Sequence, residues 1–502
     1  MTLQNCKGYF LIAAIVACSV QFPARGNNIV ETHACDRFEL PSGVKNARCG
    51  YVTVPEFHDR ATETTFKIAF VLLESTGDRN NSTPLIMERG GPGASSFARI
   101  RHFVPEGILL PLQTQRDILF VEQRGAYYSQ PYLPCDRNES PTNCKKRWEQ
   151  EGIDLDAFNM VQHANDIAFV TQSLGYNRFN YYGTSYASQL ALYILRQHPQ
   201  KLHTMILDST IAADSDIGAY QFPSLSRALR NIFRACDRDR LCQDDYPDLE
   251  QKFTHLLAQL KHNPQHLTIT IDEKKGEEYF YLNPDTFTIF VRNFLYDAHQ
   301  YASQLPRLIH DLNRGNFTLF KKIYRQRIEE TILLADGMRF ATICAAPNPP
   351  HPDLGLPPLL PSLVQISTIS TTLTDFCKLF YPVTPLPDSV YEPVRSDIPT
   401  LILHGEYDPI TPLPYGEYVA RFLENAYIFE YPGLGHGVLE QGNCPVIMAL
   451  AFLDRSQRSP DRSCIAKMGQ WGVWEDVLLP NSKLNERESQ NVRESRSRYH
   501  LQ

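Results

Sequence analysis

Short apolar strands alternate with helices in the first half of this chain, and this alternation limits the possible folds more than any other feature. The segments are a strand at 118–121, a helix at 156–174, a strand at 179–182, a buried helix at 186–197 and a strand at 204–207. Because a helix that connects two such strands crosses over the sheet, the strands lie parallel. The pattern therefore predicts an α/β protein with a mostly parallel central sheet flanked by helices.

The alternation stops after residue 211 and resumes near residue 398. Strand-like runs at 51–54, 66–72 and 85–87 precede it, and runs at 401–403 and 427–429 follow the interruption. Residues 212–397 instead contain helical pieces and a proline cluster. We therefore predict one core, made of residues 25–211 and 398–480, with an inserted, mainly helical lid at 212–397. The 502 residues would also allow about three domains in series. Residues 481–502 are rich in charge without an apolar period, which predicts a disordered tail.

The N-terminus has the pattern of a secretory signal peptide. Lys7 precedes an apolar run at 9–20, which is shorter than the roughly 20 residues that span a bilayer. We predict a signal over residues 1–24, with cleavage after Ala24. A lipoprotein-type cleavage before Cys18 is the alternative, because residues 15–18 resemble a lipobox. Either route exports the protein to a periplasmic or extracellular space, and only a lipid on Cys18 would hold it at a membrane.

The cysteine count agrees with export. Ten of the twelve cysteines follow the leader and fall into five couples of sequence neighbours. The couples are Cys35 and Cys49, Cys135 and Cys144, Cys236 and Cys242, Cys344 and Cys377, and Cys444 and Cys464. Disulfides suit an oxidising compartment, whereas zinc binding lacks both a C-x-x-C and an H-E-x-x-H motif. The sequence predicts disulfides and leaves their connectivity open.

The charge balance argues against nucleic acid as a partner. There are 49 Lys and Arg against 56 Asp and Glu, which gives a net charge of -7. No block of basic residues in the body of the chain could follow a phosphate backbone.

A candidate nucleophile lies between the strand at 179–182 and the helix at 186–197. Gly183-Thr184-Ser185-Tyr186-Ala187 is a G-x-S-x-G-like sequence with alanine at the last position. In a strand–turn–helix setting this sequence forms a nucleophile elbow, whose strained turn requires small residues on both sides of the serine. We predict that Ser185 is the catalytic serine.

Serine catalysis needs a histidine base and a carboxylate that orients it, in the chain order serine, acid, histidine. Asp408 follows the strand at 401–403, and His436 follows the strand at 427–429. Because the carboxyl ends of parallel strands share one edge of the sheet, Asp408 and His436 can meet Ser185 there. Asp208 is a rival acid because it also ends a strand, and His404 is predicted to be structural.

A glycine loop supplies candidate donors for an oxyanion hole. Gly90-Gly91-Pro92-Gly93 follows the strand at 85–87, and we predict that the N–H groups of Gly91 and Tyr186 are the donors. A phosphate-binding loop is the competing interpretation, but the Gly-Lys-Ser/Thr ending is missing.

Five ordered blocks resemble a known family. They are residues 89–95 (RGGPGAS), 122–125 (EQRG), 182–187 (YGTSYA), 404–412 (HGEYDPITP) and 433–437 (GLGHG). They resemble the α/β-hydrolase serine peptidases that include proline iminopeptidases and tripeptidyl aminopeptidases. The resemblance covers about residues 49–213 and 396–455, and it implies an α/β-hydrolase fold, exopeptidase activity and no cofactor or metal.

Two positions depart from the family pattern. Arg89 stands where relatives often have His, Pro or Asn, and its charge would either attract a carboxylate or pair with Glu88. Relatives often carry an acidic residue just after a lid cysteine to anchor the substrate ammonium, but Ala345 and Ala346 follow Cys344 here. Lid carboxylates such as Glu329 and Glu330 cannot be assigned that role from sequence.

The sequence thus predicts a secreted serine hydrolase, with an aminopeptidase as the leading hypothesis and a peptide or small ester as substrate. An ester hydrolase on the same triad and a non-catalytic binding protein are the alternatives. Since the base must be neutral, we expect activity to fall as the pH drops through about 6 to 7.

Overall fold

The computed structural model describes residues 29–468 apart from 78–82, 105–106, 137–138, 216, 273–275, 330–333, 348 and 368–372. The predicted signal peptide with Cys18, the predicted tail at 481–502 and Glu330 lie outside the described residues, as does the side chain of Glu329. No described helix has the length and apolar character needed to cross a bilayer.

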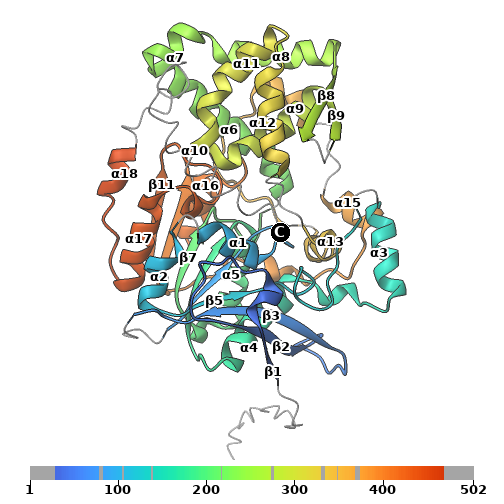
Figure 1. Ribbon diagram of the computed structural model, residues 1–502, viewed down its shortest axis with the longest axis vertical. Helices are drawn as coiled ribbons and strands as arrows, with labels where there is room; N and C mark the ends of the chain where they lie inside the picture. Colours follow the sequence, from blue (N-terminus) through green and yellow to red (C-terminus); the bar gives the residue numbers. More distant parts are fainter. Residues whose placement is uncertain are drawn as a thin grey trace, which may run out of the picture.

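A nine-stranded sheet forms the centre of the molecule (Figure 1). In spatial order the strands are β1 (Val30–His33), β2 (Ala47–Pro55), β3 (Thr65–Leu73), β5 (Ile118–Val121), β4 (Leu85–Glu88), β6 (Phe179–Thr184), β7 (Leu202–Asp208), β10 (Thr400–Gly405) and β11 (Ala426–Tyr431). The strands from β5 to β11 are parallel, and β1, β2 and β3 extend one edge in antiparallel pairs. The predicted mostly parallel sheet is confirmed, and β1 is an edge strand that the sequence pattern did not indicate.

Helices cover both faces of this sheet, which is why its central strands are buried and mostly apolar. Ile86, Leu119 and Ile402 face one core, whereas Leu85, Ile118 and Leu401 face the other, as the two-residue period of a strand requires. The first core packs against α4 (Met160–Ser173) and α5 (Tyr186–Gln197) and includes a residue of α16 (Leu413–Ala420). The second packs against α1 (Ser96–Phe103), α2 (Leu109–Gln115), α17 (Asn443–Asp454) and α18 (Ser463–Met468).

The insertion between β7 and β10 has two parts. The first part has its own apolar core and forms the lobe at the top of Figure 1. It contains α6 (Ile217–Arg238), α7 (Arg240–Asp245), α8 (Leu249–His262), the strands β8 (Gln265–Asp272) and β9 (Gly276–Leu282), α9 (Pro284–Phe294), α10 (Ala298–Tyr301), α11 (Leu305–Asn313) and α12 (Thr318–Glu329), and α14 (Pro361–Ser367) adds to it. The helical pattern did not predict the β8–β9 hairpin.

The second part belongs to the core of the sheet. Its helices α13 (Asp336–Cys344) and α15 (Leu373–Phe380) pack with α3 (Pro141–Gln150) against the apolar cluster that contains α4 and α5. Short 3-10 helices complete the secondary structure: η1 (Cys35–Phe38), η2 (Leu155–Ala157), η3 (Pro199–Lys201), η4 (Leu295–Asp297), η5 (Ala302–Gln304), η6 (Asp388–Tyr391) and η7 (Val438–Glu440). The insertion is therefore divided between two apolar cores.

Disulfides join all five couples of neighbouring cysteines, so the predicted disulfides are confirmed and their connectivity is defined. Two lie in the insertion. Cys236–Cys242 connects α6 with α7, and Cys344–Cys377 connects α13 with α15.

Candidate active site

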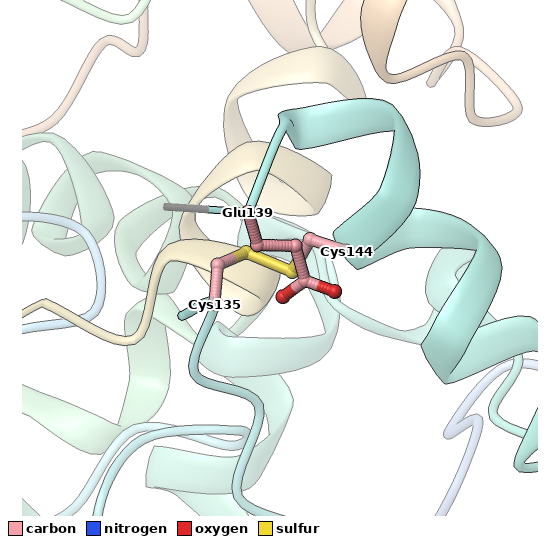
Figure 2. A group of neighbouring side chains, drawn as sticks. All are labelled: Cys135, Glu139 and Cys144. Carbon is pink, nitrogen blue, oxygen red and sulfur yellow. A yellow bond between two sulfur atoms is a disulfide. The ribbon is translucent and has the colours of Figure 1, made fainter. Parts of the chain in front are cut away.

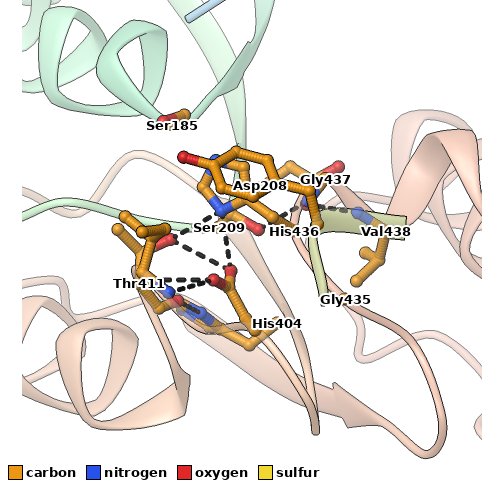
Figure 3. A network of polar contacts seen from close by, with 12 residues as sticks. Ser185, Asp208, Ser209, His404, Thr411, Gly435, His436, Gly437 and Val438 are labelled. Atoms are coloured by element: carbon orange, nitrogen blue, oxygen red, sulfur yellow. Dashed lines mark hydrogen bonds and ion pairs between the residues drawn. The ribbon is translucent and has the colours of Figure 1, made fainter. Parts of the chain in front are cut away.

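Ser185 lies at the turn between β6 and α5. Its backbone has φ 58° and ψ -126°, which is a strained conformation for a residue with a side chain. The turn is held because the Ser185 N–H donates to the Asp208 carbonyl at 2.9 Å. A Cβ atom on Gly183 would lie 2.3 Å from the carbonyl oxygen of Ala187, so the position beside the turn requires glycine. The partly exposed serine side chain thus sits on a tight elbow, at the edge of the network in Figure 3.

Asp408 and His436 form a hydrogen-bonded pair in the loops that follow β10 and β11. The His436 Nδ1 atom and the Asp408 Oδ2 atom are 2.9 Å apart, and the two side chains are 7% and 0% exposed. The other carboxylate oxygen of Asp408 accepts the N–H groups of Ile410 and Thr411, each at 2.9 Å. The Thr411 hydroxyl donates to Oδ2 at 3.1 Å. With Nδ1 committed to the carboxylate, the Nε2 atom of His436 is left as the proton acceptor.

This pairing changes the pKa values of both groups. Burial alone would raise the pKa of the Asp408 carboxyl, but the charge and hydrogen bond of His436 and the two N–H groups outweigh burial and hold it well below its usual range. Burial alone would lower the pKa of His436, but the Asp408 carboxylate raises it above the ordinary 6.5. The fall in activity at low pH, which we expect near the pKa of a free histidine, therefore moves to higher pH.

Asp208, the rival acid, contacts the backbone after His436 instead of its ring. Its carboxylate accepts the N–H groups of Val438 at 2.9 Å and Leu439 at 3.0 Å, and the Tyr182 hydroxyl at 2.7 Å. Because its carbonyl also accepts the Ser185 N–H, Asp208 ties the serine turn to the histidine loop. Gly437 packs against the end of the serine strand, where a Cβ atom would lie 3.3 Å from Cγ2 of Thr184.

The loop after β4 lies directly against the serine turn. A Cβ atom on Gly90 would lie 2.7 Å from the Ser185 Cβ and 3.2 Å from the Tyr186 nitrogen. Within the described part of the chain, neither the Gly91 nor the Tyr186 N–H has a hydrogen-bond acceptor, so both remain available as donors. Gln123 fixes this loop, because its side chain accepts the Gly93 N–H at 2.9 Å and donates to the Arg89 carbonyl at 2.8 Å.

The insertion holds the histidine loop from outside. The Tyr296 carbonyl accepts the His436 N–H at 2.9 Å and the Gln441 amide at 3.0 Å. Gln441 in turn accepts the Gly435 N–H at 2.8 Å. A Cβ atom on Gly435 would lie 2.3 Å from the Leu295 carbonyl oxygen, and the rings of Tyr296 and His436 are 4.7 Å apart. Residues 295–299 are called the clamp segment below.

His404 is buried beneath the site. Its Nδ1 atom and the Thr411 carbonyl are 2.9 Å apart, and a Cβ atom on Gly416 would lie 2.2 Å from its Nε2. Burial lowers the pKa of His404 to about 4, so the ring is neutral at neutral pH and supports the Asp408 turn.

One group of three side chains among the described residues has the spacing of metal ligands (Figure 2). Cys135 and Cys144 are joined in a disulfide, and the Glu139 carboxylate accepts hydrogen bonds from Arg147 at 2.7 and 3.1 Å. These atoms are therefore already committed to other bonds.

The structure brings Ser185, Asp408, His436 and the Gly91 loop to one edge of the sheet. Sequence reasoning missed Gln123, Gln441 and Tyr296, which hold the loops that carry those residues. Gln123 lies within the EQRG block, which was a usable signal. Nothing local marks Gln441 or Tyr296.

Comparisons with known proteins agree with this geometry. Residues 83–443 match the alpha/beta hydrolase fold family, which is more than half of the chain. The chain is 24% identical over 208 residues to the serine protease Hip1 of Mycobacterium tuberculosis, covering 36% of this chain and 38% of that protein. It is 24% identical over 204 residues to a tripeptidyl aminopeptidase of Streptomyces lividans, covering 35% and 38%. It is 31% identical over 94 residues to carboxylesterase B of Mycobacterium tuberculosis, covering 19% and 18%. The matches thus span less than half of the length of these relatives.

Proposed function

Because the chain belongs to the alpha/beta hydrolase fold family, we propose that it is a serine hydrolase that works through Ser185, His436 and Asp408. His436 takes the proton of the Ser185 hydroxyl as the oxygen attacks the acyl carbon, and it then gives that proton to the leaving group. Water repeats the sequence on the acyl-enzyme and frees the acid. Asp408 orients the ring, and the N–H groups of Gly91 and Tyr186 stabilise the oxyanion.

One observation carries the proposal. The ring of His436 is bonded through Nδ1 to a buried carboxylate that is itself fixed by three further donors. A histidine without a catalytic role would not need a buried carboxylate that is itself held by three donors. The strained Ser185 turn beside the free Gly91 and Tyr186 N–H groups supports the same proposal.

The finer proposal is an aminopeptidase that releases N-terminal residues or short peptides. The names of two relatives, a serine protease and a tripeptidyl aminopeptidase, support it. A carboxylic ester hydrolase is the second candidate, since the third relative is a carboxylesterase. Ala345 and Ala346, at the position where a carboxylate would anchor the substrate ammonium, are buried and apolar, which also favours the ester.

We propose that the protein works outside the cytoplasm. Five disulfides favour an oxidising compartment, and the leader pattern at residues 1–24 provides the route. Peptides or small esters are the proposed partners, and membrane attachment would need a lipid on Cys18.

Two measurements test the function. A fluorophosphonate should label the wild-type protein and not Ser185→Ala. Equal labelling of both would disprove Ser185 as the nucleophile, and no labelling of the wild type would leave a binding protein. Hydrolysis of an unblocked peptide amide should exceed that of its N-acetylated form. Equal turnover would remove the aminopeptidase proposal and favour the ester hydrolase.

A further inference from the structure

Arg89 carries a positive charge beside the proposed nucleophile. It is the first residue after β4, and the next residue, Gly90, lies against Ser185, with 2.7 Å between its Cβ position and the Ser185 Cβ. The Arg89 carbonyl is fixed by the Gln123 amide at 2.8 Å. The backbone of Arg89 is therefore held in place two positions before Gly91, the proposed oxyanion donor.

The adjacent carboxyl group does not neutralise this charge. Glu88 is fully buried, and its Oε2 atom accepts the Ser96 hydroxyl at 3.2 Å. Burial and the neighbouring Glu122 raise the pKa of Glu88 well above its usual range. Among the described residues Glu88 forms no ion pair with Arg89, so the alternative that Arg89 pairs with Glu88 is not realised.

Two carboxylates do act on the Arg89 charge, namely Glu440 and Asp297. Glu440 pairs with Arg99 at 3.0 Å, and Asp297 pairs with Arg327. Within the part of the chain that the structure describes, the Arg89 guanidinium itself forms no ion pair or hydrogen bond. The two carboxylates that act on Arg89 are thus each paired with another arginine.

Three arginines lie near the clamp segment. The charges of Arg292, Arg339 and Arg327 act on the Tyr296 hydroxyl together with the opposing charge of Asp408, and the Tyr296 ring lies against His436. The nearby Asp336 is paired with Arg339 at 3.0 Å. Glu440, Asp297 and Asp336 are thus each paired with an arginine, and Asp408 is paired with His436, so a substrate ammonium would find none of these carboxylates free.

We propose that Arg89 binds a carboxylate of the substrate, so that the site prefers acyl compounds with a carboxylate close to the scissile carbonyl. The inference rests on the proposed function, because it assumes that Ser185 reacts. Arg89 is a partly buried residue, and its guanidinium has a planar pair of donors that matches a carboxylate. The carboxylate would come from an acidic residue of a peptide or from the free end of a dicarboxylic acid monoester.

Two matched substrate pairs test this preference and separate the sources. Glutamyl p-nitroanilide is compared with glutaminyl p-nitroanilide, and mono-p-nitrophenyl glutarate with its methyl p-nitrophenyl diester. The measured quantity is the ratio of kcat/KM for the anionic over the neutral member. In Arg89→Gln the ratio should fall about 10- to 100-fold in at least one pair, as expected for losing a hydrogen-bonded charge partner. Arg89→Lys should keep part of the preference.

Arg60→Gln is the matched control, because Arg60 is an exposed arginine paired with Asp154 at 3.2 Å on another surface. It should keep the wild-type ratio. A fall confined to the anilide pair assigns the acidic peptide, and a fall confined to the ester pair assigns the dicarboxylic monoester.

A ratio that is the same in the wild type and Arg89→Gln for both pairs would overturn the inference. If Arg89→Gln does not fold, the wild-type ratio should still fall at high ionic strength, and a ratio independent of salt would overturn it equally. Failure of the function itself looks different, because the wild type would then turn over neither member of a pair, or turnover of both members would survive in Ser185→Ala.

Discussion

Asp208 and Asp408 both end a strand, and replacing each by asparagine should separate stability from catalysis. In Asp408→Asn the amide oxygen can keep the N–H groups of Ile410 and Thr411, which now bind one carboxylate oxygen at 2.9 Å. The NH₂ group then faces Nδ1 of His436. Because two donors cannot face one another, the ring adopts the tautomer with its proton on Nε2, where it cannot accept the serine proton.

The size of the catalytic effect follows from that tautomer. We expect kcat to fall by about 10⁴-fold, the loss typical of a triad whose acid becomes an amide. This corresponds to about 5 kcal/mol in the barrier. Stability should change by only about 1 kcal/mol, since most of the hydrogen bonds are kept.

Asp208→Asn should give the opposite result. All three of its partners, the Val438 and Leu439 N–H groups and the Tyr182 hydroxyl, donate to the carboxylate. An amide leaves at least one buried N–H without an acceptor, which costs roughly 1–3 kcal/mol of stability. The carboxylate on the His436 ring is untouched, so kcat should stay within about tenfold of wild type.

The assay combines steady-state hydrolysis of a p-nitrophenyl ester with urea denaturation, using Ser185→Ala as the inactive reference. The reasoning is refuted if Asp208→Asn loses more kcat than Asp408→Asn. It is also refuted if Asp408→Asn keeps more than about a tenth of the wild-type kcat.

Three further outcomes are expected. Because Asp408 raises the pKa of His436 and the base must be neutral, kcat/KM should fall as the pH drops through a value above 6.5. A midpoint at or below 6.5 in the pH–rate profile would contradict the role of His436 as a base paired with Asp408. Gly183→Ala should lower the free energy of unfolding in urea by about 1–3 kcal/mol, since its Cβ would lie 2.3 Å from the Ala187 oxygen, whereas Gly442→Ala, with 3.9 Å to its nearest atom, should not. Replacing Cys344 and Cys377 by alanine opens a cross-link over 33 residues and should lower the free energy of unfolding by about 4 kcal/mol. An unchanged melting temperature would contradict the view that this bridge stabilises the fold by restricting the unfolded chain.

The central sheet was predictable because its signals are local. The apolar runs at 118–121 and 401–403 and the small residues around Ser185 are visible in short windows of sequence, and each corresponds to an element of the structure. The same holds for the disulfides, since partners separated by 6 to 33 residues are sequence neighbours among the cysteines.

The supports of the site were not predictable, because they depend on distant contacts. Gln441 reaches Tyr296 across 145 positions, and nothing near either residue marks the pair. Asp208 and Asp408 were likewise equivalent as strand ends, and only the placement of the His436 ring distinguishes them. The division of the insertion between two cores has the same origin, since α13 is as helical in sequence as α9 but packs against the sheet.

The clamp segment has a consequence for how the molecule matures. The backbone of His436 is bonded to Tyr296, so the histidine loop reaches its final shape only after the inserted lobe has folded onto the sheet. A chain with a finished sheet and an unfolded insertion would hold its serine turn without a positioned base. A newly made chain would therefore pass through a stage without a positioned base, and deleting the lobe should give a protein that fluorophosphonate labels poorly instead of a more open enzyme.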